Sequence, residues 1–200
     1  IIETRTVGPT LGQDSKDKSQ FAFVVGLGAV VLFMIFFYHL SGFIADVALM
    51  AYTVMLLGIL YLMDATLTLP GVAGIILSIG MAVDANVLIF EHFKEEYQVN
   101  RKSLRLAMDA GFKRAFTTIF DSNVTTLIAA GVLFFLGTGT IRGFAITLGV
   151  GTILSMFTAI TLTQYLLKLM INSKLSENPS LYGANGFMLG VKKKGDEKNA

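Results

Sequence analysis

The chain has 200 residues, of which 54% are apolar and only 15% are charged, and its mean hydropathy is +0.66. A water-soluble chain of this length needs more charge to cover its surface. Sixteen Lys and Arg against fourteen Asp and Glu give a formal net charge of +2, too balanced to indicate a nucleic-acid-binding protein. With no cysteine and only two histidines, far apart, the sequence predicts no disulfide, metal site or cofactor.

The first twenty residues carry several charges and do not resemble a cleavable signal peptide. The chain also begins with Ile1 rather than Met. We therefore expect it to be part of a longer polypeptide.

Five apolar windows are long enough for a helix that crosses a membrane, which needs about 20 mainly apolar residues. They lack both the period-3.6 polar face of a soluble helix and the alternation of a barrel strand. The sequence therefore predicts an all-α fold, a polytopic membrane bundle of five transmembrane helices within residues 21–167. The predicted spans are residues 21–38, 47–63, 69–90, 120–137 and 143–167.

The distribution of Lys and Arg predicts the side of the membrane that each connection faces. Twelve of these residues lie between residues 91 and 118 or after the fifth span, and four lie on the opposite side. We expect residues 1–20 to be an extracytoplasmic segment that leads into the first span. Residues 168–200, rich in Gly and Lys, are predicted to be a flexible cytoplasmic tail.

The connection between the third and fourth spans has a helical pattern of its own. Its apolar residues recur every four positions, with opposite charges spaced i,i+4 on another face. This predicts an amphipathic helix at about residues 101–117 on the cytoplasmic membrane surface, either a lever or docking surface or a lipid-anchored connector. The recurring apolar residues are Leu104, Met108, Phe112 and Phe116.

Asp84 is a carboxylate inside an apolar window, roughly 9 Å from the cytoplasmic end of the third span. An ionised Asp near mid-membrane costs on the order of 3 kcal/mol, so its side chain should face protein or trapped water. Intramembrane acids commonly mark proton or ion pathways. We therefore predict that Asp84 loads and unloads a proton; the alternative is a carboxylate that only packs against a neighbouring helix.

Polar side chains near the start of the fourth span lie at a similar depth, next to Asp121 at the membrane edge. They could hold a short file of water to Asp84, although ordinary interhelical hydrogen bonding remains the alternative. Asn86 lies about 200° around the helix from Asp84 and should serve a different contact. The predicted proton pathway consists of Asp84, Ser122, Asn123, Thr125 and Thr126.

The third span contains many small residues, which allow neighbouring backbones to come close. No Lys or Arg lies inside any span, so a cationic counterpart of Asp84 would have to come from another chain or from a part of the protein outside this one. The small residues are Gly71, Gly74, Ser78, Gly80, Ala82 and Ala85.

The stretch GMAVDANVLIFE at residues 80–91 closely resembles the signature of the SecD family of bacterial protein-export membrane proteins. RTVGPTLGQDS at residues 5–15, TIFDSNVTTL at residues 118–127 and the glycine-rich residues 137–145 resemble the same family. These stretches contain a set of candidate signature or interface residues: Arg5, Gly12, Asp14, Gly80, Asn86, Glu91, Asp121, Gly137, Gly139 and Arg142.

The resemblance implies a half of a bundle of the RND transporter superfamily, with SecF as the companion half. SecD-like proteins have six spans and a large extracytoplasmic domain after the first, so this chain would hold the second to sixth spans. In the family the signature Asp is thought to carry protons in concert with an Arg and acidic residues of SecF.

The implied function is that of a non-enzymatic translocase subunit in the bacterial inner membrane, using the proton-motive force to promote preprotein export. Implied partners are the SecYEG translocon, YajC, YidC, the preprotein and membrane lipids. The coupling ion would be H⁺, although an Asp near hydroxyls also suits Na⁺. Two alternatives remain: an RND-type exporter of small molecules or lipids, and a structural subunit of the translocon.

Overall fold

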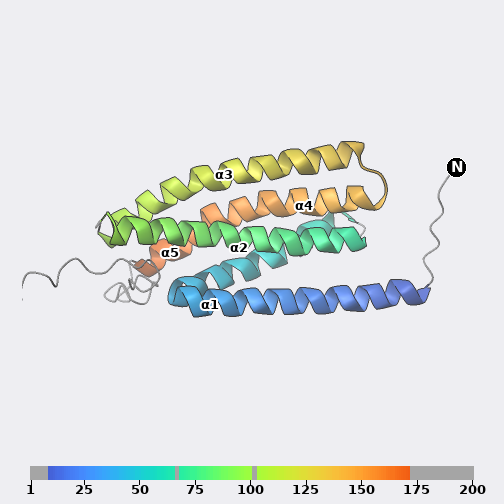
Figure 1. Ribbon diagram of the computed structural model, residues 1–200, viewed down its shortest axis with the longest axis horizontal. Helices are drawn as coiled ribbons and strands as arrows, with labels where there is room; N and C mark the ends of the chain where they lie inside the picture. The colour runs from blue at the N-terminus through green and yellow to red at the C-terminus, as the bar shows by residue number, and fades with distance from the viewer. Residues whose placement is uncertain (1–8, 66–67, 101–102, 172–200) are drawn as a thin grey trace, which may run out of the picture.

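The computed structural model describes residues 9–65, 68–100 and 103–171, and all regular structure within these ranges is helical (Figure 1). This confirms the predicted all-α fold. The last three elements follow one another without a break and form one long rod. The elements are α1 (Pro9–Leu62), α2 (Leu69–Gln98), α3 (Leu104–Leu136), α4 (Thr140–Phe157), the π-helical turn η1 (Thr158–Thr163) and α5 (Gln164–Ile171).

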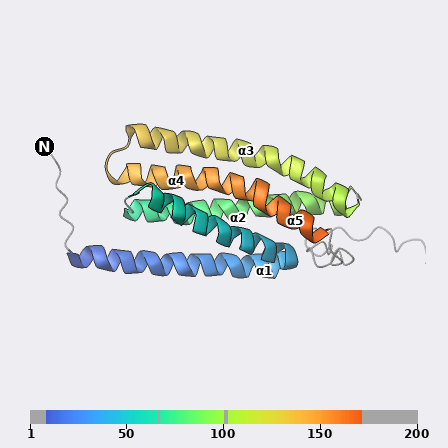
Figure 2. The ribbon, with the colours of Figure 1, turned by 180° about the vertical axis from the view of Figure 1, so that it is seen from behind.

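Helix α1 folds back on itself at His39, whose backbone angles (φ 49°, ψ −118°) are not helical. The arms before and after this residue run in roughly opposite directions and diverge from the reversal (Figures 1 and 2). Gly42 permits the tight reversal, because a Cβ atom there would collide with the backbone carbonyl of Met34.

The first two predicted spans are therefore the two arms of α1. Counted as continuous helices, the predicted five become four that are long and apolar enough to cross a membrane within the described ranges, because α1 contains both of the first two predicted spans. The physical reason is that a single residue in a non-helical conformation suffices for the reversal, so the helical pattern continues on both sides of it.

Helix α3 joins two elements that the sequence predicted separately, the surface helix at about residues 101–117 and the fourth span. Its 33 residues extend about 50 Å, more than the roughly 30 Å hydrocarbon core of a bilayer. Met108 and Phe112 of the apolar stripe are buried, and Gly111 lies against the backbone of Phe93 in α2. Two residues of the stripe thus pack on protein, whereas Phe116 is 43% exposed, and the segment continues into the fourth span instead of forming a separate helix. Its predicted position on the cytoplasmic membrane surface stays a prediction.

Helix α2 lies at the centre of the bundle and contacts α1, α3 and α4. The predicted close approach occurs where Gly74 meets Thr147 of α4 and where Ser78 meets Gly151, positions with no room for an added Cβ. The Tyr52 hydroxyl of α1 donates to the Gly151 carbonyl at 3.3 Å, so three helices meet there. Gly80 differs from the expectation, because no atom lies within 4 Å of where its Cβ would be.

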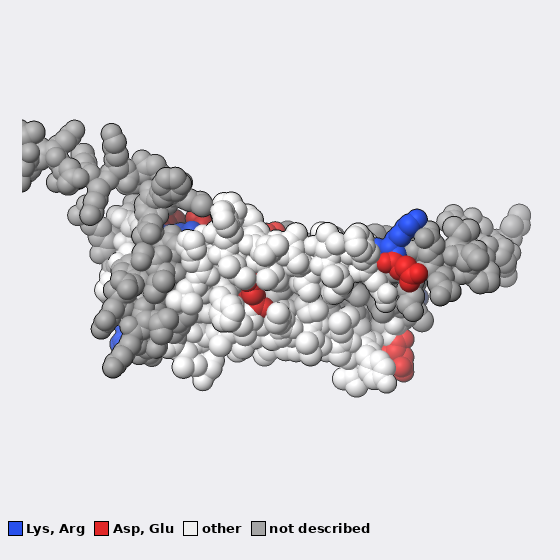
Figure 3. Space-filling view, turned by 90° about the horizontal axis from the view of Figure 1, so that it is seen from below, with Lys and Arg blue, Asp and Glu red and all other residues white. Residues whose placement is uncertain are grey.

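The outer surface of the bundle is apolar. Phe21 and Phe36 on the first arm of α1 and Phe135 on α3 each expose more than 70% of their surface. Figure 3 shows a broad face that is nearly free of charge, with charged side chains gathered toward its ends and an acidic spot near its middle. Such a surface suits lipid or a partner subunit rather than water, and the chain is a membrane protein.

The first and last helices extend into the two predicted terminal segments. Helix α1 already begins at Pro9, so Gly12 and Asp14 are helical, and α5 continues to Ile171. Arg5 and residues 172–200 lie outside the described residues.

Candidate functional site

A cavity of about 300 Å³ opens between α2 and α3 around Asp84. Each helix contributes residues spaced i, i+3, i+4 and i+7, which place them on one helical face. The structure thus brings Asp84 together with Ser122, Asn123 and Thr126 of the predicted pathway. The lining residues are Met81, Asp84, Ala85 and Leu88 from α2 and Ile119, Ser122, Asn123 and Thr126 from α3.

The Asp84 carboxylate is exposed to this cavity. Over residues 9–65, 68–100 and 103–171, no Lys, Arg or His side chain is within ion-pair distance of it. A carboxylate in this position can accept hydrogen bonds from water in the cavity. The charge distribution of the sequence already indicated that any cationic counterpart would come from elsewhere.

The hydroxyl groups of α3 bond to their own helix. Ser122 donates to the Ile119 carbonyl at 3.1 Å, and Thr126 donates to the Ser122 carbonyl at 3.1 Å. Their oxygens keep lone pairs that can accept from water in the cavity. Thr125 also donates to the Ser122 carbonyl, at 2.7 Å, but it does not line the cavity. Its neighbour Thr126 occupies the lining position because successive residues differ by about 100° around a helix.

Asn86 faces a different helix, as predicted from its position relative to Asp84. Its Oδ1 atom accepts a hydrogen bond from the Thr163 hydroxyl of η1 at 2.9 Å, and both side chains are buried. Helix α2 therefore presents Asp84 to the α3 cavity and Asn86 to the end of the fifth predicted span.

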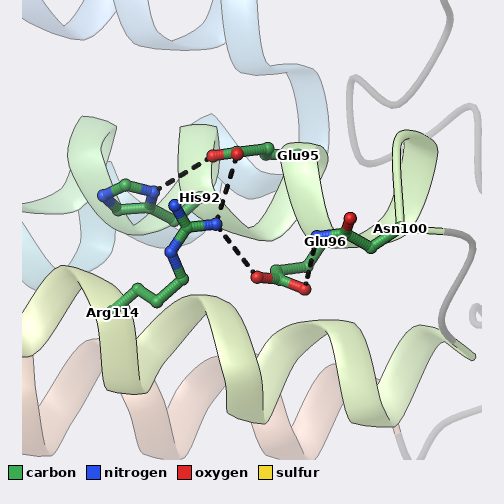
Figure 4. A network of polar contacts seen from close by, with 5 residues as sticks. All are labelled: His92, Glu95, Glu96, Asn100 and Arg114. Carbon is green, nitrogen blue, oxygen red and sulfur yellow. Dashed lines mark hydrogen bonds and ion pairs between the residues drawn. The ribbon is translucent and has the colours of Figure 1, made fainter.

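A polar network joins α2 and α3 beyond the apolar part of the bundle (Figure 4). Arg114 of α3 contacts Glu95 at 3.2 Å and Glu96 at 3.1 Å, and both carboxylates belong to α2. Asn100 donates to Glu96 at 2.9 Å, and His92 lies 3.5 Å from Glu95. Sequence reasoning missed this network, although acidic residues before the connection and basic residues after it were a signal that the two helices could pair.

Glu91 connects α2 to the reversal in α1. Its carboxylate accepts from the Tyr38 hydroxyl at 2.9 Å and pairs with Lys94 at 3.1 Å. The Lys94 ammonium also lies 4.3 Å from the centre of the Tyr38 ring, a cation–π contact. This signature residue therefore has a packing contact at one end of the bundle, away from the lining of the cavity.

Three other signature residues, Gly137, Gly139 and Arg142, lie at the α3–α4 hairpin. Gly139 has φ +54°, a conformation that favours glycine, and Gly137 leaves no room for a Cβ beside the Leu133 carbonyl. Arg142 donates to the Phe134 carbonyl at 3.1 Å and closes the hairpin. Asp121 is exposed and does not line the cavity.

The described part of the chain contains no group of three or more His, Asp or Glu side chains that could hold a metal ion. The site therefore consists of a carboxylate, hydroxyls and an amide around a space large enough for several water molecules.

Comparison with known proteins relates this arrangement to protein export. The profile of the family described as "Protein export membrane protein SecD/SecF, C-terminal" matches residues 1–173. The chain is 61% identical over 187 residues to the protein translocase subunit SecD of Acidaminococcus fermentans, covering 94% of this chain and 45% of that protein. It is 56% identical over 172 residues to the corresponding subunit of Dictyoglomus turgidum, covering 86% of this chain and 43% of that protein.

A crystal structure of SecDF from Thermus thermophilus, described as a translocon-associated membrane protein, has the same fold. The two structures superpose with a TM-score of 0.79 at 39% identity, over 82% of this chain and 23% of that one. The chain spans less than half the length of the two curated relatives. On these matches, the chain belongs to the SecD/SecF family of protein export membrane proteins and corresponds to the family's C-terminal part.

Proposed function

We propose that this chain is the membrane half of a SecD-type subunit that uses the proton-motive force to promote preprotein export through the Sec translocon. Family membership and the names of the relatives favour this function over export of small molecules or lipids. The observation that carries the proposal is the placement of Asp84 in a cavity that polar residues of α3 also line.

The proposed mechanism depends on two states of Asp84. The ionised carboxylate attracts water and any cation that a partner supplies, whereas the protonated form tolerates an apolar neighbour. Loading and unloading a proton would therefore change how closely α2 packs against its neighbours. One charge crossing about 100 mV yields about 2.3 kcal/mol, roughly a fifty-fold bias in a two-state equilibrium. Because a complete reversal needs more than this, several protons would drive each stroke.

The proposed partners are SecF, the translocon and the preprotein. SecF would supply the companion half of the bundle and a cationic side chain at the depth of Asp84. The exposed apolar face on the first arm of α1 offers a surface for lipid or such a partner. The complex with SecF would associate with the translocon SecYEG, together with YajC and YidC. Parts of the protein outside this chain would bind the preprotein.

The proposed location is the bacterial inner membrane, with the α2–α3 connection in the cytoplasm. The Lys and Arg distribution supports this orientation. The proposed coupling ion is H⁺. Na⁺ is the alternative, because hydroxyl and carboxylate oxygens can coordinate it.

The proposal is tested with Asp84→Asn, which keeps the shape of the side chain but cannot carry a proton at physiological pH. We expect the stimulation of preprotein export by a proton gradient to be lost in membrane vesicles that contain the full-length protein and its partners. The matched control is Asp64→Asn, an exposed residue with φ +48°, a conformation that Asn accepts readily. This control should leave the stimulation unchanged.

Replacing the proton gradient with a sodium gradient identifies the ion, because only the coupling ion should restore stimulated export. Full proton-stimulated export by Asp84→Asn would instead mean that Asp84 only packs, as in a structural subunit of the translocon.

A further inference from the structure

The hydrogen bond between Thr163 and Asn86 differs from every other buried hydroxyl contact on α4 and η1 in the described structure. Thr147, Thr152, Ser155 and Thr158 each donate to a carbonyl three or four residues earlier on their own rod. Thr163, which is fully buried, donates instead to Asn86 of α2 at 2.9 Å. One hydroxyl in this series therefore bonds to a neighbouring helix.

The backbone conformation at Thr163 is also different from that of the rest of the rod. Residues Thr158–Thr163 form a π-helical turn between α4 and α5. A π-helical turn holds more residues than an α-helical turn, so it changes the direction in which the following side chains point. Such turns are rare and occur frequently at functional sites. Here the turn ends at the residue that bonds to α2.

Asn86 and Asp84 are related by the geometry of α2. They are two residues apart, so their side chains point about 200° apart, and rotation of the helix about its axis moves both. Ser78 packs against Gly151 on one side of Asp84 along the chain, and Asn86 bonds to Thr163 on the other. Asp84 is thus held between two contacts with the same rod.

We propose that Asn86 and Thr163 are positioning residues, whose hydrogen bond fixes the rotation of α2 and thereby keeps Asp84 directed into the α3 cavity. The inference deepens the proposed function, because it concerns the residue that is proposed to carry the proton. The pair acts through α2 and lies on the face of that helix opposite the cavity.

The test measures how fast a water-soluble reagent reaches the cavity face of α2, and it does not depend on export. This chain contains no cysteine, so Leu88→Cys introduces a single thiol on the cavity face of α2. The full-length protein in membranes, with any cysteine outside this chain replaced by serine, is treated with a water-soluble thiol reagent and its labelling rate is followed. Thr163→Val removes the hydroxyl while keeping the shape of the side chain, and it should change this rate several-fold.

Two further variants make the comparison specific. Thr152→Val is the matched control, because Thr152 is also fully buried but bonds within its own helix, to the Leu148 carbonyl at 2.7 Å. Thr163→Ser retains the donor. Both should label at the rate of the parent, since neither loses the contact with Asn86.

Asn86→Ala removes the acceptor and leaves the sequence of the π-helical turn unchanged. Its labelling rate tests the inference if Thr163→Val does not accumulate in membranes. It should change the labelling rate in the same direction, and the double variant should be no more affected than either single variant. Equal rates for Asn86→Ala, Thr163→Val and Thr152→Val would overturn the inference. That result is distinguishable from failure of the proposed function, which is read from export by Asp84→Asn.

Discussion

Two carboxylates within the apolar helices, Asp84 and Asp46, occupy opposite environments. Asp84 is exposed to a cavity, whereas Asp46 is only 4% exposed and neither of its oxygens has a hydrogen-bond partner among the described residues. A buried charge without a partner destabilises the folded state, because water no longer solvates it. Of the two, only Asp84 lines a cavity that water can enter.

We predict that Asp46→Asn stabilises the purified protein, since it removes a buried charge and keeps the shape of the side chain. The expected gain in free energy of unfolding is on the order of 1 kcal/mol, because the buried amide still lacks partners. Thermal unfolding in detergent at neutral pH measures the effect, with the exposed Asp64→Asn as a control that should not change. A loss of stability would show that the Asp46 carboxylate interacts favourably in the folded protein.

Sequence spacing could predict the polar residues that line the cavity with Asp84. Ser122, Asn123 and Thr126 line the cavity because their i, i+1 and i+4 spacing includes the face directed at α2. Thr125 could not be separated from Thr126 without the rotation of α3 about its axis, which depends on packing. Asn86 was predicted to make a different contact from Asp84. Its partner Thr163 could not be predicted, because it lies 77 residues away and its direction depends on the π-helical turn.

At the scale of the helix, the sequence predicts apolar stretches more reliably than helix ends. The first two predicted spans are the two arms of α1, and the reversal at His39 lies directly after the first predicted span. The sequence did not show that the helix resumes at once after His39, where a longer connection was expected. The pattern of Met108 and Phe112 is the same whether an apolar face meets lipid or another helix. The position of Gly111 against Phe93 and the pairing of Arg114 with Glu96 show that this segment meets α2.

The contact between α2 and α4 depends on the small size of Gly151. A Cβ atom there would lie 2.5 Å from Ser78 side-chain atoms and 3.0 Å from the Tyr52 hydroxyl. We predict that Gly151→Ala lowers the free energy of unfolding by about 1 to 3 kcal/mol, as overpacking does elsewhere. Thermal unfolding in detergent would measure the decrease.

The matched control for this prediction is Gly131→Ala in α3, where nothing lies within 4 Å of the added Cβ. It should leave stability unchanged or raise it, since alanine favours helix more than glycine does. Ser78→Gly should partly restore the Gly151→Ala variant by removing the atoms that collide. Equal effects of the two alanine substitutions would mean that the helices separate easily at this crossing.

At the scale of the whole molecule, α2 and α3 are longer than a membrane requires. Their lengths of 30 and 33 residues correspond to about 45 and 50 Å, so their connected ends extend beyond a hydrocarbon core of about 30 Å. The network of Arg114, Glu95 and Glu96 lies in that extension, where water and headgroups can solvate it. The extension therefore forms a rigid polar end to an otherwise apolar bundle.

This arrangement predicts the side of the membrane on which each end lies. Met63 follows α1 at the opposite end of α2 from Val99, and the two are similarly exposed, at 53% and 57%. Because Lys and Arg concentrate beyond Val99, we expect Met63→Cys to react with a membrane-impermeant thiol reagent in intact spheroplasts. Val99→Cys should react only after permeabilisation. The full-length protein without other cysteines is the parent for both variants, and the opposite labelling pattern would contradict the orientation on which the direction of proton movement depends.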